Sequence, residues 1–255
     1  MEHIKLKELY EVFRVESGVA LFLEDHLERL FRGARKAGII INMDFFEAME
    51  YVDLFLASSG IANGNVRLSF YFENGQRKSI SYEARFIPHQ YPPADWYRKG
   101  VACMLMYSER INPETKIANP ELRNRANELI SQENVFEALL VNRDGEITEG
   151  SRSNVFFIHD DALITAPDKK VLPGVVQKKT IFLAEKMKIP VEYRSIKASR
   201  DLENMDACFI TGTSPRILPV NRVENIKLQA SHPLTEALMG DFNEMIQTYI
   251  TDHKK

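Results

Sequence analysis

The chain has 255 residues, of which 44% are hydrophobic and 27% are charged, and its formal net charge at pH 7 is -3. This length and hydrophobic fraction allow a substantial core, in either one long domain or two short ones. Because acidic and basic residues are interleaved, the charge balance argues against a nucleic acid or a membrane surface as the main partner.

The two cysteines, Cys103 and Cys208, are far apart in the sequence and have apolar neighbours, which predicts buried free thiols. A disulfide scaffold or a metal site is therefore not expected. The sequence contains no apolar stretch long enough to cross a bilayer, and residues 1–5 lack the apolar core of a signal peptide. We expect a soluble, cytoplasmic protein.

Alternating apolar residues predict strands in the first part of the chain. Residues 9–15 alternate as a half-buried strand does, and a second extended run, 19–23, follows after a short turn. Residues 66–72 and 79–87 have the same character. Because residues 73–75 read Glu-Asn-Gly, a hairpin signal, these two strands are expected to pair.

Two helices are expected between these strands. Asp25 can cap the first helix, which would end at Gly38. The second begins at Asp44, has Glu47 in place for a capping box, and closes at residues 58–60. The first part of the chain is therefore predicted to be a mixed α/β unit.

Three prolines between residues 88 and 93 mark a domain boundary, since neither a helix nor a sheet ladder tolerates that density of proline. We expect a small N-terminal domain over residues 1–87, a linker over 88–96 and a larger domain over 97–255. In the larger domain, strands are expected at 100–107, 138–141, 154–158, 162–166, 191–195 and 207–211. Helices are expected at 120–132, 175–188 and 234–249.

Lys116 and Glu149 carry the chemistry that stands out in this sequence. Lys116 lies in the run Thr-Lys-Ile-Ala-Asn just ahead of a predicted helix, and Glu149 ends a strand before Gly150. A lysine amine can form a Schiff base with an aldehyde, and a buried carboxylate can keep a heterocyclic nitrogen protonated. Taken singly, Lys116 would be interpreted as a solvated surface charge and Glu149 as an exposed turn residue. Together they supply two functions that a pyridoxal phosphate enzyme requires.

A phosphate group would need its own cradle, and three segments could provide one. Arg29 lies in a His-x-x-Arg-Leu run, and its guanidinium fork suits a phosphate dianion. Gly174 precedes a predicted helix, so the amides of Val175 and Val176 could point at an anion. A Thr-Gly-Thr-Ser turn ending at Ser214 offers hydroxyls and amides at the end of a strand.

The order and spacing of these residues resemble the class IV aminotransferases, or fold type IV enzymes, over residues 9–220. That family includes branched-chain and D-amino-acid aminotransferases and aminodeoxychorismate lyase. The run from Thr148 to Phe156 carries the most specific part of the resemblance. One departure is Pro120, which follows Asn119 where relatives often have a tyrosine or a long apolar residue.

The resemblance implies a two-domain α/β fold with pyridoxal 5'-phosphate bound between a small N-terminal α/β domain, which starts later than is typical of the family, and a larger C-terminal mixed-sheet domain that carries the lysine. It also implies a homodimer. The resemblance makes Lys116 the catalytic residue. The implied cofactor contacts are Arg29, Lys116, Glu149, Asn154, Val175, Val176, Thr213 and Ser214.

Substrate recognition is expected to use arginines, because an amino acid carboxylate is bound well by a guanidinium. Arg67 and Arg216 are the candidates, with an ordinary surface or structural role as the alternative for each. The favoured reaction is transamination of an amino acid. The alternative is an aminodeoxychorismate lyase that releases pyruvate and 4-aminobenzoate, and a third possibility is a non-catalytic pyridoxal phosphate-binding protein. Metal-dependent and serine hydrolases are set aside, because the sequence lacks paired-histidine spacing and a Gly-x-Ser-x-Gly elbow.

Overall fold

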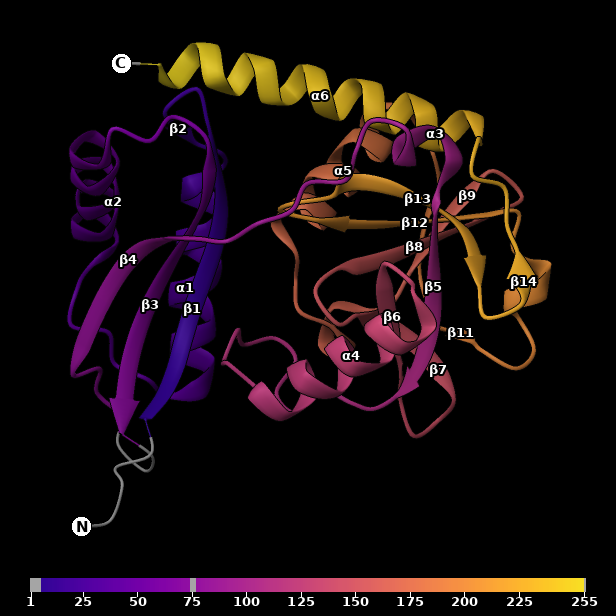
Figure 1. Cartoon of the computed structure of the whole chain (residues 1–255), viewed down its shortest axis with the longest axis horizontal. Helices are drawn as coiled ribbons and strands as arrows, with labels where there is room; N and C mark the ends of the chain where they lie inside the picture. Colours follow the sequence, from indigo (N-terminus) through magenta and orange to yellow (C-terminus); the bar gives the residue numbers. More distant parts are fainter. Residues whose placement is uncertain (1–5, 74–76, 255) are drawn as a thin grey trace. The chain divides into compact units, whose positions relative to one another are not determined.

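The computed structural model describes residues 6–73 and 77–254, and the chain divides into two compact units (Figure 1). The first unit contains Met1–Gln90, Thr115–Ala118 and Met245–Lys255. The second contains Tyr91–Glu114 and Asn119–Glu244. The division after Gln90 falls within the expected linker, whereas the lysine segment, expected in the C-terminal domain, groups with the first unit.

The first unit is a small antiparallel sheet packed against two helices. Its strands lie in the order β2-β1-β3-β4, with β1 Leu6–Glu16, β2 Val19–Ala20, β3 Gly64–Glu73 and β4 Ser81–Ile87. The helices are α1 Leu23–Ala37 and α2 Phe45–Ser59. Alternate residues of β1 face the helices, so Leu9, Phe13 and Val15 join one core with apolar residues of β3, α1 and α2.

The helix termini of the first unit show one correct and one wrong prediction. The capping box of α2 is confirmed, since Asp44 accepts from the Glu47 amide and the Glu47 carboxylate accepts from the Asp44 amide. The predicted cap at Asp25 is wrong, because α1 begins at Leu23 after Phe22, whose φ of 54° is left-handed. Asp25 instead lies in the first turn, where its negative charge interacts favourably with the helix dipole. The turn predicted at 73–75 lies largely outside the described residues, but β3 and β4 do pair antiparallel.

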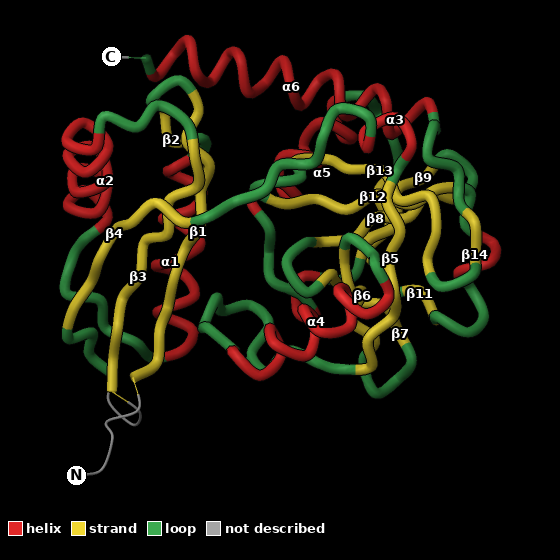
Figure 2. Tube along the Cα trace, in the orientation of Figure 1, coloured by secondary structure: helices red, strands yellow, loops and turns green. Residues whose placement is uncertain are grey.

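The second unit is built on a mixed sheet in the order β10-β9-β8-β12-β13-β5-β6-β7-β11, with β14 beside β13 (Figure 2). Its strands are β5 Val101–Tyr107, β6 Glu137–Val141, β7 Glu146–Gly150, β8 Asn154–His159, β9 Ala162–Thr165, β10 Val191–Tyr193, β11 Ile196–Lys197, β12 Ala207–Gly212, β13 Arg216–Val223 and β14 Ile226–Lys227. Its helices are α3 Trp96–Lys99, α4 Pro120–Glu133 and α5 Val175–Lys186, with short 3-10 turns at Asp168–Lys170 and Leu202–Asn204. Helix α6 spans Pro233–His253, with residues up to Glu244 in the second unit and the rest in the first.

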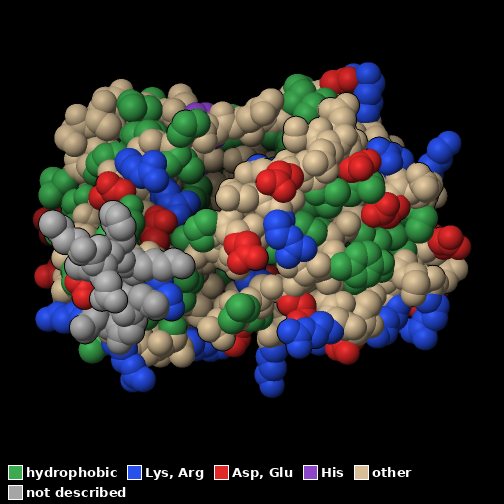
Figure 3. Space-filling model, turned by 60° about the horizontal axis from the view of Figure 1, so that its bottom comes forward, with side chains coloured by type: hydrophobic (Ala, Val, Ile, Leu, Met, Phe, Trp, Pro, Cys, Tyr) green, Lys and Arg blue, Asp and Glu red, His purple; other side chains and the backbone are tan. Residues whose placement is uncertain are grey.

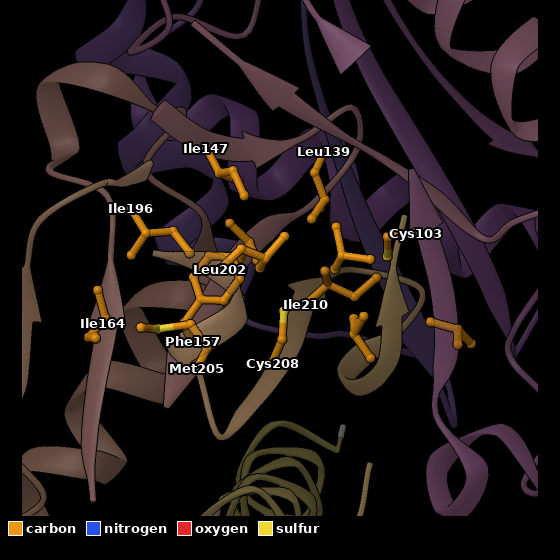
Figure 4. Close-up of a cluster of buried hydrophobic side chains, with 14 of the residues drawn as sticks. Cys103, Leu139, Ile147, Phe157, Ile164, Ile196, Leu202, Met205, Cys208 and Ile210 are labelled. Carbon is orange, nitrogen blue, oxygen red and sulfur yellow. The ribbon is translucent and has the colours of Figure 1, made fainter. Parts of the chain in front are cut away.

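The core of the second unit lies on one face of this sheet (Figure 4). It includes Cys103 and Cys208, which are buried free thiols as predicted, and burial raises the pKa of both. The other face of β6 packs against α4 through Ala138 and Leu140. Strand β6 is thus buried on both sides, which explains its nearly continuous apolar sequence.

Sequence reasoning missed β13, although it pairs with both β12 and β5. Pro219 lies in the middle of this strand, and a proline there normally argues against a central strand. The face drawn in Figure 3 carries lysine, arginine, aspartate and glutamate side chains in mixture. Within the described residues, no helix combines the length and apolar character needed to span a membrane.

Candidate active site

A buried charged cluster forms inside the first unit, on the face of β1 that meets α1. Glu11 points inward between Leu9 and Phe13, and its carboxylate is fully buried. Arg29 of α1 donates to it from Nε at 2.8 Å and from Nη2 at 2.5 Å. His26, one turn earlier on α1, lies with Nδ1 3.0 Å from the same carboxylate. The His-x-x-Arg spacing therefore puts both side chains on the helix face that meets Glu11.

Charge compensation in this cluster determines the protonation of its members. Burial alone would raise the pKa of Glu11, but the charges of Arg29 and Lys116 outweigh it and hold this pKa far below the ordinary 4.5. Burial lowers the pKa of His26 from its ordinary 6.5, although the Glu11 carboxylate opposes this shift. Glu11 is thus ionised and His26 neutral near pH 7. A carboxylate only accepts, so His26 carries its proton on Nδ1.

Lys116 lies beside this cluster because its segment extends the small sheet. The Tyr10 amide donates to the Lys116 carbonyl at 3.1 Å, and the Ala118 amide donates to the Glu8 carbonyl at 2.8 Å. Lys116 Nζ lies 5.4 Å from the centre of the Tyr10 ring. The charge of Lys116 acts with that of Arg29 to lower the pKa of Glu11.

Arg67 lies on the opposite face of the same sheet. Its guanidinium donates to both oxygens of Glu8, at 2.7 Å each, and its Cζ lies 3.6 Å from the centre of the Tyr10 ring. Burial and the hydrogen bond from Arg67 oppose each other at Glu8, and the net effect lowers the pKa of this carboxyl. Tyr10 is therefore the aromatic side chain against which both Lys116 and Arg67 lie.

In the second unit, Glu149 lies near the end of β7 and is buried. Its Oε1 accepts from Arg110 Nε at 2.9 Å, and its Oε2 accepts from the Leu172 amide at 3.3 Å. Arg110 also donates to the Ser151 carbonyl. Glu149 is therefore a buried carboxylate held in a fixed orientation, which the sequence alone could not show.

Asn154 begins β8 and is held against the loop that precedes α5. Its Nδ2 donates to the Leu172 carbonyl at 2.8 Å. A Cβ at Gly174 would lie 2.0 Å from Asn154 Oδ1, so this close approach requires glycine. Gly174 is the N-cap of α5, and its amide donates to the Gln177 side chain. Val175 and Val176 occupy the first turn, where backbone amides have no acceptor within the helix.

The Thr-Gly-Thr turn leaves β12 next to the start of β8. Thr211 pairs directly with Asn154 across the two strands, so their side chains share one face of the sheet. Thr211 is 1% exposed, and its Oγ1 has no hydrogen-bond partner among the described residues. Thr213 and Ser214 follow and are half-buried. Arg216 has a left-handed φ of 56° and donates to Asn243 of α6 at 2.8 Å.

These two sets of residues have the chemistry that pyridoxal phosphate requires. The first unit supplies an amine and an arginine beside one buried carboxylate. The second supplies a buried carboxylate for a ring nitrogen, a helix N-terminus and a buried hydroxyl, that of Thr211, still able to donate. The donor set therefore fits the cofactor.

Sequence reasoning missed several residues that organise these sets. Glu11 lies between Leu9 and Phe13 in the alternating strand 9–15, so it occupies an inward-facing position. A charged residue at such a position could have been recognised from the sequence as a buried carboxylate. Glu137 precedes the apolar run of β6 and is buried. No sequence signal indicates Arg110, because its contact with Glu149 joins residues far apart in the chain.

Comparison with known proteins gives the class. The chain has the fold of a branched-chain aminotransferase from Escherichia coli, with a TM-score of 0.83 and 19% identity, and the match covers 94% of this chain and 86% of that one. It also has the fold of a branched-chain aminotransferase from Thermoproteus uzoniensis with norvaline, with a TM-score of 0.78 and 22% identity, and that match covers 96% of this chain and 88% of the other. A Legionella pneumophila structure provisionally named 4-amino-4-deoxychorismate lyase matches at 0.80 and 24%, covering 93% and 90%. The predicted fold type IV architecture is confirmed.

The family model for class IV aminotransferases matches residues 8–223, and the chain belongs to this family. The D-alanine aminotransferase of Bacillus licheniformis is 27% identical over 247 residues, covering 89% of this chain and 83% of that protein. That of Listeria monocytogenes serotype 1/2a, strain 10403S, is 27% identical over 257 residues, covering 93% and 86%. Members of this family depend on pyridoxal phosphate, and the prediction of a class IV enzyme is confirmed.

Proposed function

We propose that this chain transfers the amino group of a small amino acid, with Lys116 as the covalent anchor of pyridoxal 5'-phosphate. The observation that carries the proposal is the position of Lys116 in the first unit, where the Tyr10 amide donates to its carbonyl at 3.1 Å and Nζ lies 5.4 Å from the Tyr10 ring. The strand that holds this segment, β1, also carries Glu11, the partner of Arg29. The charges of Lys116 and Arg29 both lower the pKa of Glu11.

The roles of the remaining residues follow from their chemistry. When bound, the cofactor provides a conjugated ring that accepts the electrons of a deprotonated substrate carbon. Glu149 would keep the ring nitrogen protonated. Arg29, the amides of Val175 and Val176, and the Thr213 and Ser214 groups would hold the phosphate, with Asn154 fixing the loop.

Lys116 would have a second role when the substrate is bound. Its neutral Nζ would take the proton from the substrate Cα and later release that proton again, so Lys116 would serve first as the general base and then as the general acid of the reaction. Arg67 and Arg216 remain our candidates for binding the substrate carboxylate. Arg67 already engages Glu8, so a substrate carboxylate would have to compete with that ion pair.

The substrate we favour is D-alanine, since two relatives named D-alanine aminotransferase are each 27% identical to this chain. The second candidate reaction is the elimination of pyruvate from aminodeoxychorismate, which the fold likeness to the Legionella protein favours. Both reactions release pyruvate, but only the second yields 4-aminobenzoate. A homodimer, expected from the family resemblance, stays a prediction that light scattering can test.

The test is a visible absorption spectrum of the chain reconstituted with pyridoxal phosphate, followed by addition of D-alanine, L-leucine or aminodeoxychorismate. We expect a visible band that D-alanine bleaches with release of pyruvate. Release of 4-aminobenzoate from aminodeoxychorismate would instead establish the lyase. A visible band that none of these compounds alters would favour a non-catalytic binding protein. A chain without any visible band would overturn the role of Lys116.

A further inference from the structure

Glu137 is a buried carboxylate that the proposed reaction does not use. It is 2% exposed, at the start of β6. The next inward residues of this strand, Leu139 and Val141, belong to the apolar core. Burying a carboxylate is unfavourable unless its oxygens are fully hydrogen-bonded, so its partners indicate what it does.

The partners of Glu137 come mainly from a single turn. Oε1 accepts from the Ala138 amide at 2.9 Å and from Ser151 Oγ at 2.6 Å. Oε2 accepts from the Arg152 amide at 3.2 Å and from Ser153 Oγ at 2.9 Å. Three of these four donors thus lie in residues 151–153, the turn between Glu149 and Asn154.

The turn is also tightly packed against Glu137. A Cβ at Gly150 would lie 2.0 Å from Ser153 Oγ and 3.0 Å from Glu137 Cγ, so only glycine fits there. The Gly150 amide donates to the Ser153 carbonyl at 2.8 Å. From outside, Arg123 donates to the Ser151 carbonyl at 2.8 Å. The turn is therefore fixed by contacts on two sides.

The residues at both ends of this turn form hydrogen bonds with the backbone of Leu172. Glu149 accepts from the Leu172 amide at 3.3 Å, and Asn154 donates to the Leu172 carbonyl at 2.8 Å. Leu172 lies two residues before Gly174, the N-cap of α5. A displacement of the turn would therefore move the Glu149 carboxylate and the start of α5 together.

We propose that Glu137 is a positioning residue that holds the turn 151–153 and thereby sets the orientation of Glu149 toward the cofactor ring. The proposal rests on the proposed function for the identity of the ring and on the hydrogen bonds above for the mechanism. Glu137 itself touches neither substrate nor cofactor in this scheme. It acts only through Glu149 and Asn154.

Glu137→Gln tests this directly. Each carboxylate oxygen accepts a backbone N–H, from Ala138 or from Arg152, and a backbone donor cannot reverse its direction. An amide has one oxygen and one NH2, so either orientation leaves an NH2 facing an N–H. A second variant, Ser151→Ala with Ser153→Ala, removes two hydroxyl donors and leaves the backbone donors satisfied. Leu202→Ala, in the same core, is the control for general loss of stability.

The first readout needs no cofactor. Amide hydrogen exchange of the apoprotein in residues 149–154 and at Leu172 and Gly174 should accelerate by at least about tenfold in Glu137→Gln and in the double serine variant. Leu202→Ala should show no such local change. Exchange in these segments that matches the wild type would overturn the proposal.

The second readout connects Glu137 to Glu149. In the loaded protein, Glu137→Gln should shift the pH midpoint of the visible band and weaken cofactor affinity by about tenfold. In a Glu149→Gln background the same change should have no further effect on that midpoint, because the two residues act in series. Additive shifts would overturn the coupling. A wild-type chain without a visible band would overturn the proposed function, and the exchange measurement would then decide the role of Glu137 alone.

Discussion

Glu11 and Arg29 form a buried ion pair in which one carboxylate accepts from both Nε and Nη2 of the guanidinium. Neither side chain has more than 6% of its surface exposed. The pair fixes the plane of the guanidinium, and Lys116 acts on the same carboxylate. If Arg29 and Lys116 hold the cofactor as proposed, the Glu11 carboxylate would help to orient the phosphate ligand as well as stabilise the fold.

Loss of the Glu11 charge should destabilise the protein strongly. Glu11→Gln leaves Arg29 buried beside a neutral group, and we expect the free energy of unfolding to fall by about 3 kcal/mol. Urea denaturation measures this change. Glu83→Gln, which alters an exposed ion pair with Arg85 in the same unit, should change the free energy of unfolding by less than about 1 kcal/mol. Equal effects of the two substitutions would contradict the description of Glu11.

His26 should make stability depend on pH below neutrality. Above its ordinary pKa of 6.5, the imidazole is neutral in both states. As the pH falls below 6.5, the unfolded chain binds a proton at His26 that the folded chain resists, so stability decreases. Below pH 4.5, the depressed pKa of Glu11 adds a further loss in the same direction.

The measurement is thermal denaturation between pH 8 and pH 5. His26→Gln, which can still donate to Glu11 but does not titrate, should lose less stability over that range than the wild type does. His89→Gln, an exposed control, should behave as the wild type. Identical pH profiles for all three proteins would exclude His26 as the titrating group.

Lys116→Ala should abolish the visible band of the reconstituted protein and its turnover. The reason is that no other amine is assigned to the cofactor aldehyde. Lys99→Ala, at an exposed lysine paired with Asp95, is the matched control and should retain both properties. A variant that lacks the Lys116 amine and keeps the wild-type spectrum would disprove the assignment.

Arg29→Lys should weaken cofactor retention while preserving a buried positive charge beside Glu11. Lysine lacks the planar fork, so we expect the dissociation constant for pyridoxal phosphate to rise by about tenfold or more. Equilibrium dialysis gives this constant. Arg32→Lys, on an exposed position of the same helix, should leave the constant unchanged. If Arg29→Lys binds the cofactor as tightly as the wild type, the phosphate has another ligand.

Thr211→Val should separate cofactor binding from stability. Since Thr211 Oγ1 has no partner among the described residues, its replacement by a methyl group should not destabilise the apoprotein. If the hydroxyl donates to the phosphate, cofactor affinity should fall by about tenfold. Thr165→Val is the opposite case, because Thr165 Oγ1 donates to the Val155 carbonyl, and its loss should cost about 1 kcal/mol of stability. Unchanged affinity in Thr211→Val would remove this hydroxyl from the site.

The sequence by itself determined the local structure and the chemical class. Alternation in β1, the capping box of α2 and the continuous apolar run of β6 are local patterns that follow from helix and strand periodicity. The Lys116 and Glu149 segments were recognisable because each has its residues close together in the chain. Strand β13 could not be recognised in this way, because Pro219 in its middle argues against a strand. The strand forms nevertheless, since it pairs with both β12 and β5.

Only the tertiary structure decided which charges meet. Glu11 of β1 pairs with Arg29 of α1, and Glu149 pairs with Arg110. Glu137 accepts hydrogen bonds from the donors of the turn 151–153. The grouping of Thr115–Ala118 with the first unit also depends on a pairing with β1 that joins residues about a hundred positions apart. Such contacts depend on packing and on the need to satisfy buried polar groups, and no short sequence pattern records them.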